Sequence, residues 1–81
     1  VQTENVEIEA AGLIDAAQAE SEIEAYMNAL GPGDLLIVDQ LKTIAINNGA
    51  TRINSITPAA DVTPDPYEMV RPGTITITRA A

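Results

Sequence analysis

The chain has 81 residues, enough for one compact domain whose core is near the lower limit of adequate size. Its formal charge of −8, from 4 basic and 12 acidic residues, argues against nucleic acid or an anionic membrane as a partner, because phosphate binding needs clustered Lys and Arg. It contains no Cys and no His, which excludes disulfides, thiolate nucleophiles and the commonest acid–base side chain. The absence of these two residue types excludes most enzyme classes.

The longest apolar run, residues 35–38, is far shorter than the roughly 20 residues of a membrane span. The chain begins at Val1 with polar residues and shows no signal segment. We therefore expect residues 1–81 to form a single domain cut from a larger parent protein, which holds part of the function.

Acidic residues are concentrated in residues 1–40, which contain nine carboxylates and no basic side chain. Residues 41–81 contain three acidic and four basic residues. The simpler interpretation is a solvated face kept soluble by its charge, and the alternative is an acidic docking surface for a basic neighbour.

The first predicted element is a strand over residues 5–11, where apolar and acidic side chains alternate. Val6 and Ile8 fall on one face, and Glu7 and Glu9 fall on the other. This pattern is typical of a half-buried strand.

A helix is predicted over residues 16–30, because apolar residues recur there with the helical period. Asp15 is the expected N-cap, and Gln18 three residues later completes a capping-box pattern. Gly31 is the expected left-handed C-cap residue, and Pro32 prevents continuation of the helix.

Residues 35–38 are predicted to be extended and to enter the core. Asp39 is expected to cap a second, short helix that ends at residues 47–49. Its far side carries Ile46, a candidate contact residue. The side chains expected to point inward from this helix are Leu41, Ile44 and Ala45.

Two strands are predicted in the second half, over residues 50–57 and 73–79. Ile53 and Ile56 are three apart, so either a bulge lies between them or Ile56 faces outward. The intervening residues 57–72 contain four prolines and are too long for a hairpin turn, which indicates a functional or disordered loop.

These elements predict an α+β fold, a two-layer sandwich in the order strand-helix-helix-strand-strand. Both helices are expected on one face of a small three-stranded sheet. The predicted core consists of Val6, Ile8, Ile23, Met27, Leu30, Leu41, Ile44, Ile53, Ile75 and Ile77.

No constellation of residues predicts catalysis. Ser21 and Ser55 have only Lys42 as a candidate base, and neither lies in a strand-to-helix elbow. Asp61 and Asp65 offer oxygen ligands for Ca²⁺ but lack the regular spacing of an EF-hand, so a solvated loop is preferred over an ion site. We expect no catalytic residue, no metal site, no cofactor and no enzymatic activity.

The features left for protein contacts are exposed side chains and sheet edges. Candidate interface residues are Ile46, Ile56, Tyr67 and Met69. The last predicted strand is either an edge protected by Arg79 or a ladder completed by another chain or domain.

The order of these signals over about three quarters of the chain resembles the C-terminal part of the baseplate J-like protein family. One departure is Ala50, where the family commonly has Val. The matching residues are the helix end Tyr26-Met27-Asn28-Ala29-Leu30-Gly31-Pro32-Gly33-Asp34, residues 41–46, Asn48-Gly49-Ala50-Thr51-Arg52-Ile53, Thr57-Pro58-Ala59-Ala60-Asp61-Val62 and Arg71-Pro72-Gly73-Thr74-Ile75-Thr76-Ile77-Thr78.

The resemblance implies a structural role in the baseplate wedge of a contractile phage tail or related injection system, encoded by a phage or prophage. It implies other baseplate or tail proteins as partners. The domain would then be part of the virion tail baseplate, which is assembled in the bacterial host cytoplasm. A homo-oligomer of the domain within this assembly is a further expectation. It transfers no catalytic or cofactor residue. The alternative is an independent small acidic adaptor module of an unrelated system.

Overall fold

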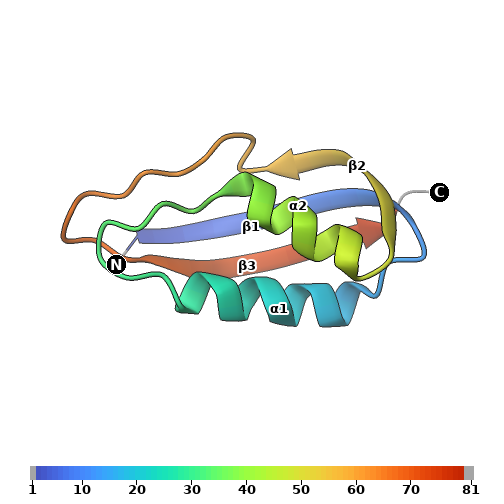
Figure 1. Cartoon of the computed structure of the whole chain (residues 1–81), viewed down its shortest axis with the longest axis horizontal. Coiled ribbons are helices and arrows are strands. Elements are labelled where there is room, and N and C mark those ends of the chain that lie inside the picture. Colours follow the sequence, from blue (N-terminus) through green and yellow to red (C-terminus); the bar gives the residue numbers. More distant parts are fainter. Residues whose placement is uncertain (1, 80–81) are drawn as a thin grey trace.

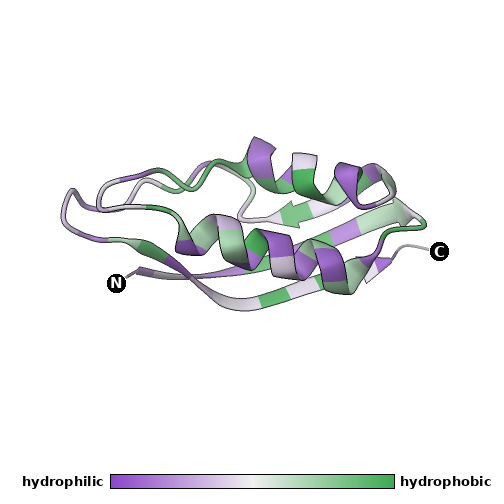
Figure 2. Cartoon of the chain, turned by 60° about the horizontal axis from the view of Figure 1, so that its bottom comes forward, coloured by the Kyte–Doolittle hydropathy of each residue, from purple (hydrophilic) through white to green (hydrophobic). Residues whose placement is uncertain are grey.

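The computed structural model describes residues 2–79, which form three strands and two helices. In chain order these are β1 (Gln2–Gly12), α1 (Ala16–Asn28), α2 (Val38–Asn47), β2 (Ala50–Thr57) and β3 (Val70–Arg79). The strand order is β2-β1-β3, with β1 antiparallel to β2 and parallel to β3. Both helices cover one face of the sheet (Figure 1, Figure 2), which confirms the predicted α+β fold with its order of elements.

The core lies between this face of the sheet and the two helices. Alternation along β1 buries Val6, Ile8 and Ala10, while Glu7 and Glu9 on the opposite face are exposed. Six of the ten predicted core residues are buried. The other four pack at the border of the core and are partly buried: Leu30, Ile44, Ile53 and Ile75.

Three fully buried residues lie outside the periodic segments. Ile14 follows β1, Leu36 lies in the connection between the helices, and Val70 is the first residue of β3. Each lies at or beyond the end of an element, where the strand period of 2 residues and the helix period of 3.6 residues no longer indicate which side chains are buried. Periodicity therefore did not identify Ile14 and Val70, whereas Leu36 belongs to the run over residues 35–38 that is predicted to enter the core.

Helix α1 begins where predicted, and its N-cap is confirmed. Asp15 Oδ1 accepts a hydrogen bond from the backbone N–H of Gln18 at 3.1 Å. The reciprocal half of the capping box does not form, because the Gln18 side chain donates to Glu22 at 3.1 Å. The backbone N–H of Asp15 donates to the carbonyl of Asn48 at 2.8 Å. The start of α1 is thereby tied to the end of α2.

The predicted end of the first helix is wrong by two residues. Helix α1 ends at Asn28, and Gly31 is not left-handed. The left-handed residue of this turn is Gly33, with φ of 78°.

Arg71 of β3 occupies the C-terminal end of α1. Its Nη1 donates to the carbonyl oxygens of Leu30 at 2.8 Å and Met27 at 3.3 Å. A guanidinium satisfies these carbonyls and complements the helix dipole. This arginine performs the role that the sequence analysis assigned to Gly31.

Helix α2 is capped from a distant loop. Its N-cap residue is Ile37, which has no side-chain acceptor, so the prediction of Asp39 as the cap is wrong. The backbone N–H of Val38 instead donates to Asp61 Oδ1 at 2.9 Å. Asp39 lies in the first turn, where its charge favours the helix dipole.

A bulge in strand β2 lets its two isoleucines, which are three residues apart, point to the same side. Ile56 lies opposite Ile8 and Ile53 lies opposite Ala10, with a break in register between these pairs. Both isoleucines pack against the core. The alternative in which Ile56 faces outward is therefore wrong.

The long loop between β2 and β3 lies along the connection between the helices. Leu36 and Val62 exchange two backbone hydrogen bonds of 3.0 Å. The N–H of Gly33 donates to the carbonyl of Glu68 at 2.9 Å. These bonds fix the predicted loop to the body of the domain, together with the Asp61 cap of α2 and the bond from the N–H of Gln2 to the carbonyl of Met69 at 2.8 Å.

Candidate interaction surface

The structure places the four predicted interface residues in different surroundings. Ile46 is 47% exposed and Tyr67 is 94% exposed. Ile56 is half-buried and faces the core. Met69 is also half-buried, and its sulfur accepts a hydrogen bond from Arg71 Nη2 at 3.3 Å.

These residues do not form one surface. The C-terminal end of α2 and the loop over residues 58–69 lie toward opposite ends of the long axis (Figure 1). An interface role for Ile46 and Tyr67 stays a prediction, for two separate places on the molecule.

A different apolar surface arises in the connection before α2. The backbone is extended up to Ile37, and Val38 begins α2, so the side chains of residues 35–38 alternate between outside and inside. Leu36 and Val38 are buried, while Leu35 and Ile37 are 42% and 38% exposed. Two large aliphatic side chains therefore lie at the surface side by side.

Helix α1 extends this surface. Tyr26, Leu30, Leu35 and Ile37 line a hollow of about 420 Å³, and we call these four residues the apolar patch. The Tyr26 hydroxyl accepts a hydrogen bond from the N–H of Ile37 at 3.2 Å. The bond joins α1 to the connection and holds the aromatic ring in place.

The rim of the apolar patch is acidic and includes Asp34 and Asp61. Asp34 Oδ2 accepts from the N–H of Gly31 at 2.8 Å, and Asp61 Oδ1 accepts from Val38 as the α2 cap. Both aspartates are exposed, so their charge lies at the border of an apolar hollow. The arrangement suits a partner that presents an aliphatic or aromatic side chain next to Lys or Arg.

The apolar patch is not among the surfaces predicted from the sequence. Residues 35–38 are predicted to enter the core, although a strand period already places every second residue of such a run outside. The contributions of Tyr26 and Leu30 required the packing of α1 against this connection.

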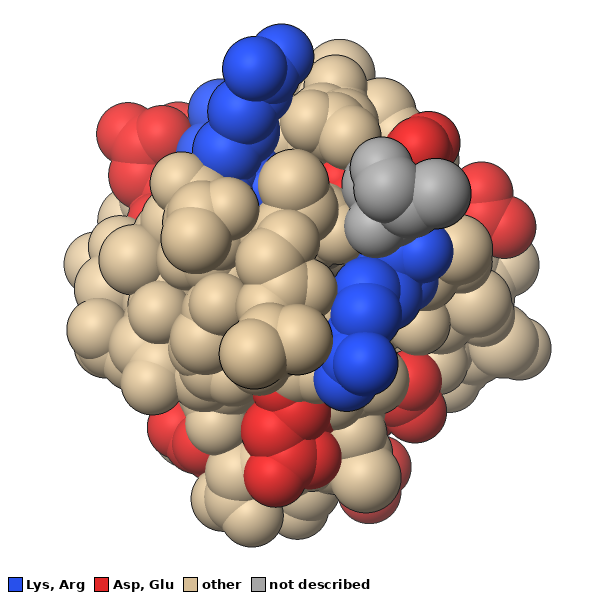
Figure 3. All heavy atoms as spheres, turned by 90° about the vertical axis from the view of Figure 1, so that its right-hand side faces the viewer, with Lys and Arg blue, Asp and Glu red and all other residues tan. Residues whose placement is uncertain are grey.

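The charged residues outside the patch serve mostly as a solvated surface and as internal partners. Figure 3 shows the end where β1 joins α1, with basic side chains among uncharged surface and carboxylates around its border. Arg79 Nη2 donates to the carbonyl of Ile14 at 2.8 Å. Arg79 and Arg71 therefore both donate to backbone carbonyls within the domain.

Two features are absent from the described part of the chain. Within residues 2–79, no three His, Cys, Asp or Glu side chains are grouped so that they could hold a metal ion. Neither helix there has the length and apolar character required to cross a bilayer.

Comparison with known protein families decides the identity of the fold. The family model of the Baseplate J-like protein C-terminal domain matches residues 3–78. The chain belongs to this family. The resemblance found in the sequence is confirmed, and the family gives the chain a structural role in a phage tail baseplate. No curated protein matches the chain.

Proposed function

We propose that this baseplate J-like domain is a contact domain of a contractile-tail wedge, in a phage or prophage, which binds other baseplate or tail proteins and catalyses nothing. The observation that carries the proposal is the apolar patch with its acidic rim. Exposed aliphatic side chains that lie together inside a polar rim are typical of a surface that a partner covers.

The apolar patch is formed before any partner binds. The Tyr26 hydroxyl bond and the Asp61 cap fix α1, α2 and the long loop relative to one another. A surface held in this way loses little conformational entropy on docking, so more of the burial energy contributes to affinity.

The absence of His and Cys supports a role without catalysis. The charge of −8 disfavours nucleic acid and anionic membranes as partners and favours a basic protein surface over a second copy of the chain. Family membership supports the baseplate role over an adaptor of an unrelated system. Assembly with the partner would take place in the host cytoplasm, before the tail is complete.

The test substitutes Leu35→Gln and Ile37→Thr together in the parent protein and measures its incorporation into tail particles. Because both side chains are already partly exposed, we expect the melting temperature to change little while incorporation falls at least about tenfold, which corresponds to about 1.4 kcal/mol. The matched control is Leu13→Gln, an exposed leucine away from the patch, which should assemble normally. Normal incorporation of the folded double variant would refute the role of the patch.

A further inference from the structure

The outer edge of β3 is the more regular of the two sheet edges. β1 pairs with the inner edge of β3, and within residues 2–79 no strand pairs with its outer edge. From Val6 opposite Ile75 to Ala10 opposite Arg79, the pairing with β1 runs without a break. The pairing of β2 with β1 is broken at two places, and such bulges are a common way to blunt an edge.

The backbone of β3 directs hydrogen-bonding groups outward. The N–H of Ile77 points away from β1 and donates to Glu20 Oε2 at 3.4 Å, a long hydrogen bond. Because backbone groups alternate sides along a strand, those of Ile75 point to the same side. Arg79 does not protect this edge, since its guanidinium is bound to the carbonyl of Ile14.

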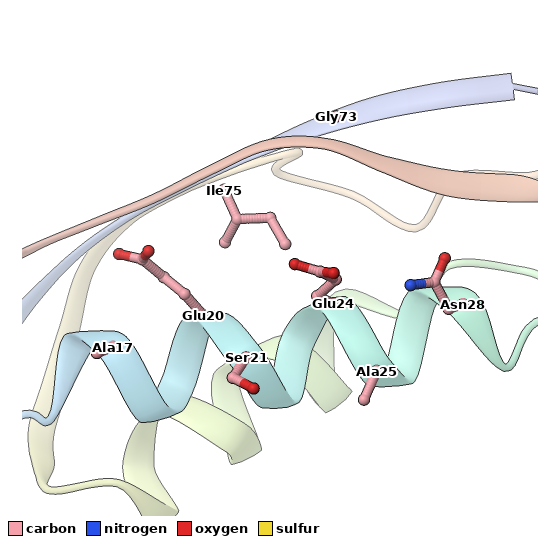
Figure 4. A pocket seen from close by; sticks show the side chains of 8 residues that line it. All are labelled: Ala17, Glu20, Ser21, Glu24, Ala25, Asn28, Gly73 and Ile75. Carbon is pink, nitrogen blue, oxygen red and sulfur yellow. The ribbon is translucent and has the colours of Figure 1, made fainter.

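A groove of about 590 Å³ runs along this edge between β3 and α1. Figure 4 shows Glu20, Glu24 and Asn28 on successive turns of α1, directed toward β3, with Ile75 opposite them. The next row of the helix that lines the groove is small, which leaves room for side chains: Ala17, Ser21 and Ala25.

We infer that the β3 edge accepts an extended segment of a partner protein, which adds a strand to the sheet and places basic side chains over Glu20 and Glu24. Main-chain hydrogen bonds would supply affinity, and alternate side chains entering the groove would supply specificity. A second copy of the chain fits poorly, because pairing two β3 edges would bring the same carboxylates of both copies together.

This inference rests on the proposed function, in that it names a second kind of contact for the same domain. Its first test uses a capped peptide of about ten residues with alternating Val and Lys. We expect the amide signals of Ile75 and Ile77 to shift in NMR spectra, and their hydrogen exchange to slow at least about tenfold. Protection along β2 instead, or no protection at millimolar peptide, would overturn the inference.

A second peptide separates strand pairing from general attraction. It has the same sequence and charge, but every backbone nitrogen is methylated, so neither of its edges can form a ladder with β3. It should leave the exchange of Ile75 and Ile77 unchanged. Equal protection by both peptides would contradict pairing along β3.

Two matched double variants test the carboxylates. Glu20→Gln with Glu24→Gln should weaken peptide binding at least about fivefold, while retaining an oxygen that can accept from Ile77. Glu7→Gln with Glu9→Gln removes the same charge from the exposed face of the sheet and should change binding less than about twofold. Equal weakening would show that net charge alone attracts the peptide. Because these assays use the isolated chain, they can fail while incorporation through the apolar patch succeeds, and the reverse.

Discussion

Single polar side chains hold the ends of both helices in this domain. Asp61 caps the N-terminus of α2, and Arg71 binds the C-terminal carbonyls of α1. Both residues lie more than 20 positions from the helix end that they satisfy, at separations of 23 for Asp61 and 44 or 41 for Arg71. The long loop and β3 therefore contribute directly to helix stability.

Removal of the distant cap should destabilise the domain. Asp61→Ala leaves the N–H of Val38 without its acceptor, so we expect the free energy of unfolding to fall by about 1 kcal/mol in denaturant titrations. Asp61→Asn should recover most of the loss, because an amide oxygen also accepts. Asp65→Ala is the control, since the bond of Asp65 to Glu68 uses its backbone carbonyl. Equal effects of both alanine variants would refute the capping role.

Among the elements, each of the two helices contributes three buried side chains to the core. The inner face of α1 carries Ala19, Ile23 and Met27, all fully buried, and this helix packs along β3 beside the central strand. Helix α2 covers the β2 half of the same face with Leu41 and Ala45. The sheet is thus covered on one face by two helices that share its core.

Truncation of the inner face of α1 should have a large effect. Ile23→Ala removes buried methyl groups and leaves a cavity, so we expect it to lower the free energy of unfolding by about 2 to 5 kcal/mol. Ile46→Ala makes the same change at a position that is 47% exposed on α2, and should lower it by less than about 1 kcal/mol. Denaturant unfolding of the two variants compares them directly. Similar losses would show that Ile23 is not a core residue.

On the scale of the whole molecule, charge is the dominant surface property. The net charge is −8, and nine of the 12 acidic residues precede residue 41. Glu7 and Glu9 lie on the exposed face of the sheet, while Glu20 and Glu24 line the groove beside β3. Like charges distributed in this way repel one another in the compact state.

Screening of this repulsion should stabilise the domain. Raising NaCl from about 0.01 M to 0.15 M shortens the Debye length from roughly 30 Å to 8 Å, so the melting temperature should increase. The variant with Glu7→Gln and Glu9→Gln should show a smaller increase, since part of the repulsion is already removed. A melting temperature that falls with NaCl would show that the carboxylates are favourably paired.

The sequence by itself determined the class of the fold. Alternation along residues 5–11 and 73–79 and the helical period from Ala16 onward are local patterns, and local patterns decide which residues are strand or helix and which face is apolar. The order of elements, the Asp15 cap and most of the core followed from them. The series of motifs also led to the family.

Only the tertiary structure decided the strand order, the bulge between Ile53 and Ile56, and the partners of Asp61 and Arg71. It also decided that Leu35 and Ile37 would lie beside α1 at the surface. These outcomes depend on which distant segments meet, and a short-range propensity contains no information about the path of the chain between them. The apolar patch and the groove beside β3 are products of that path.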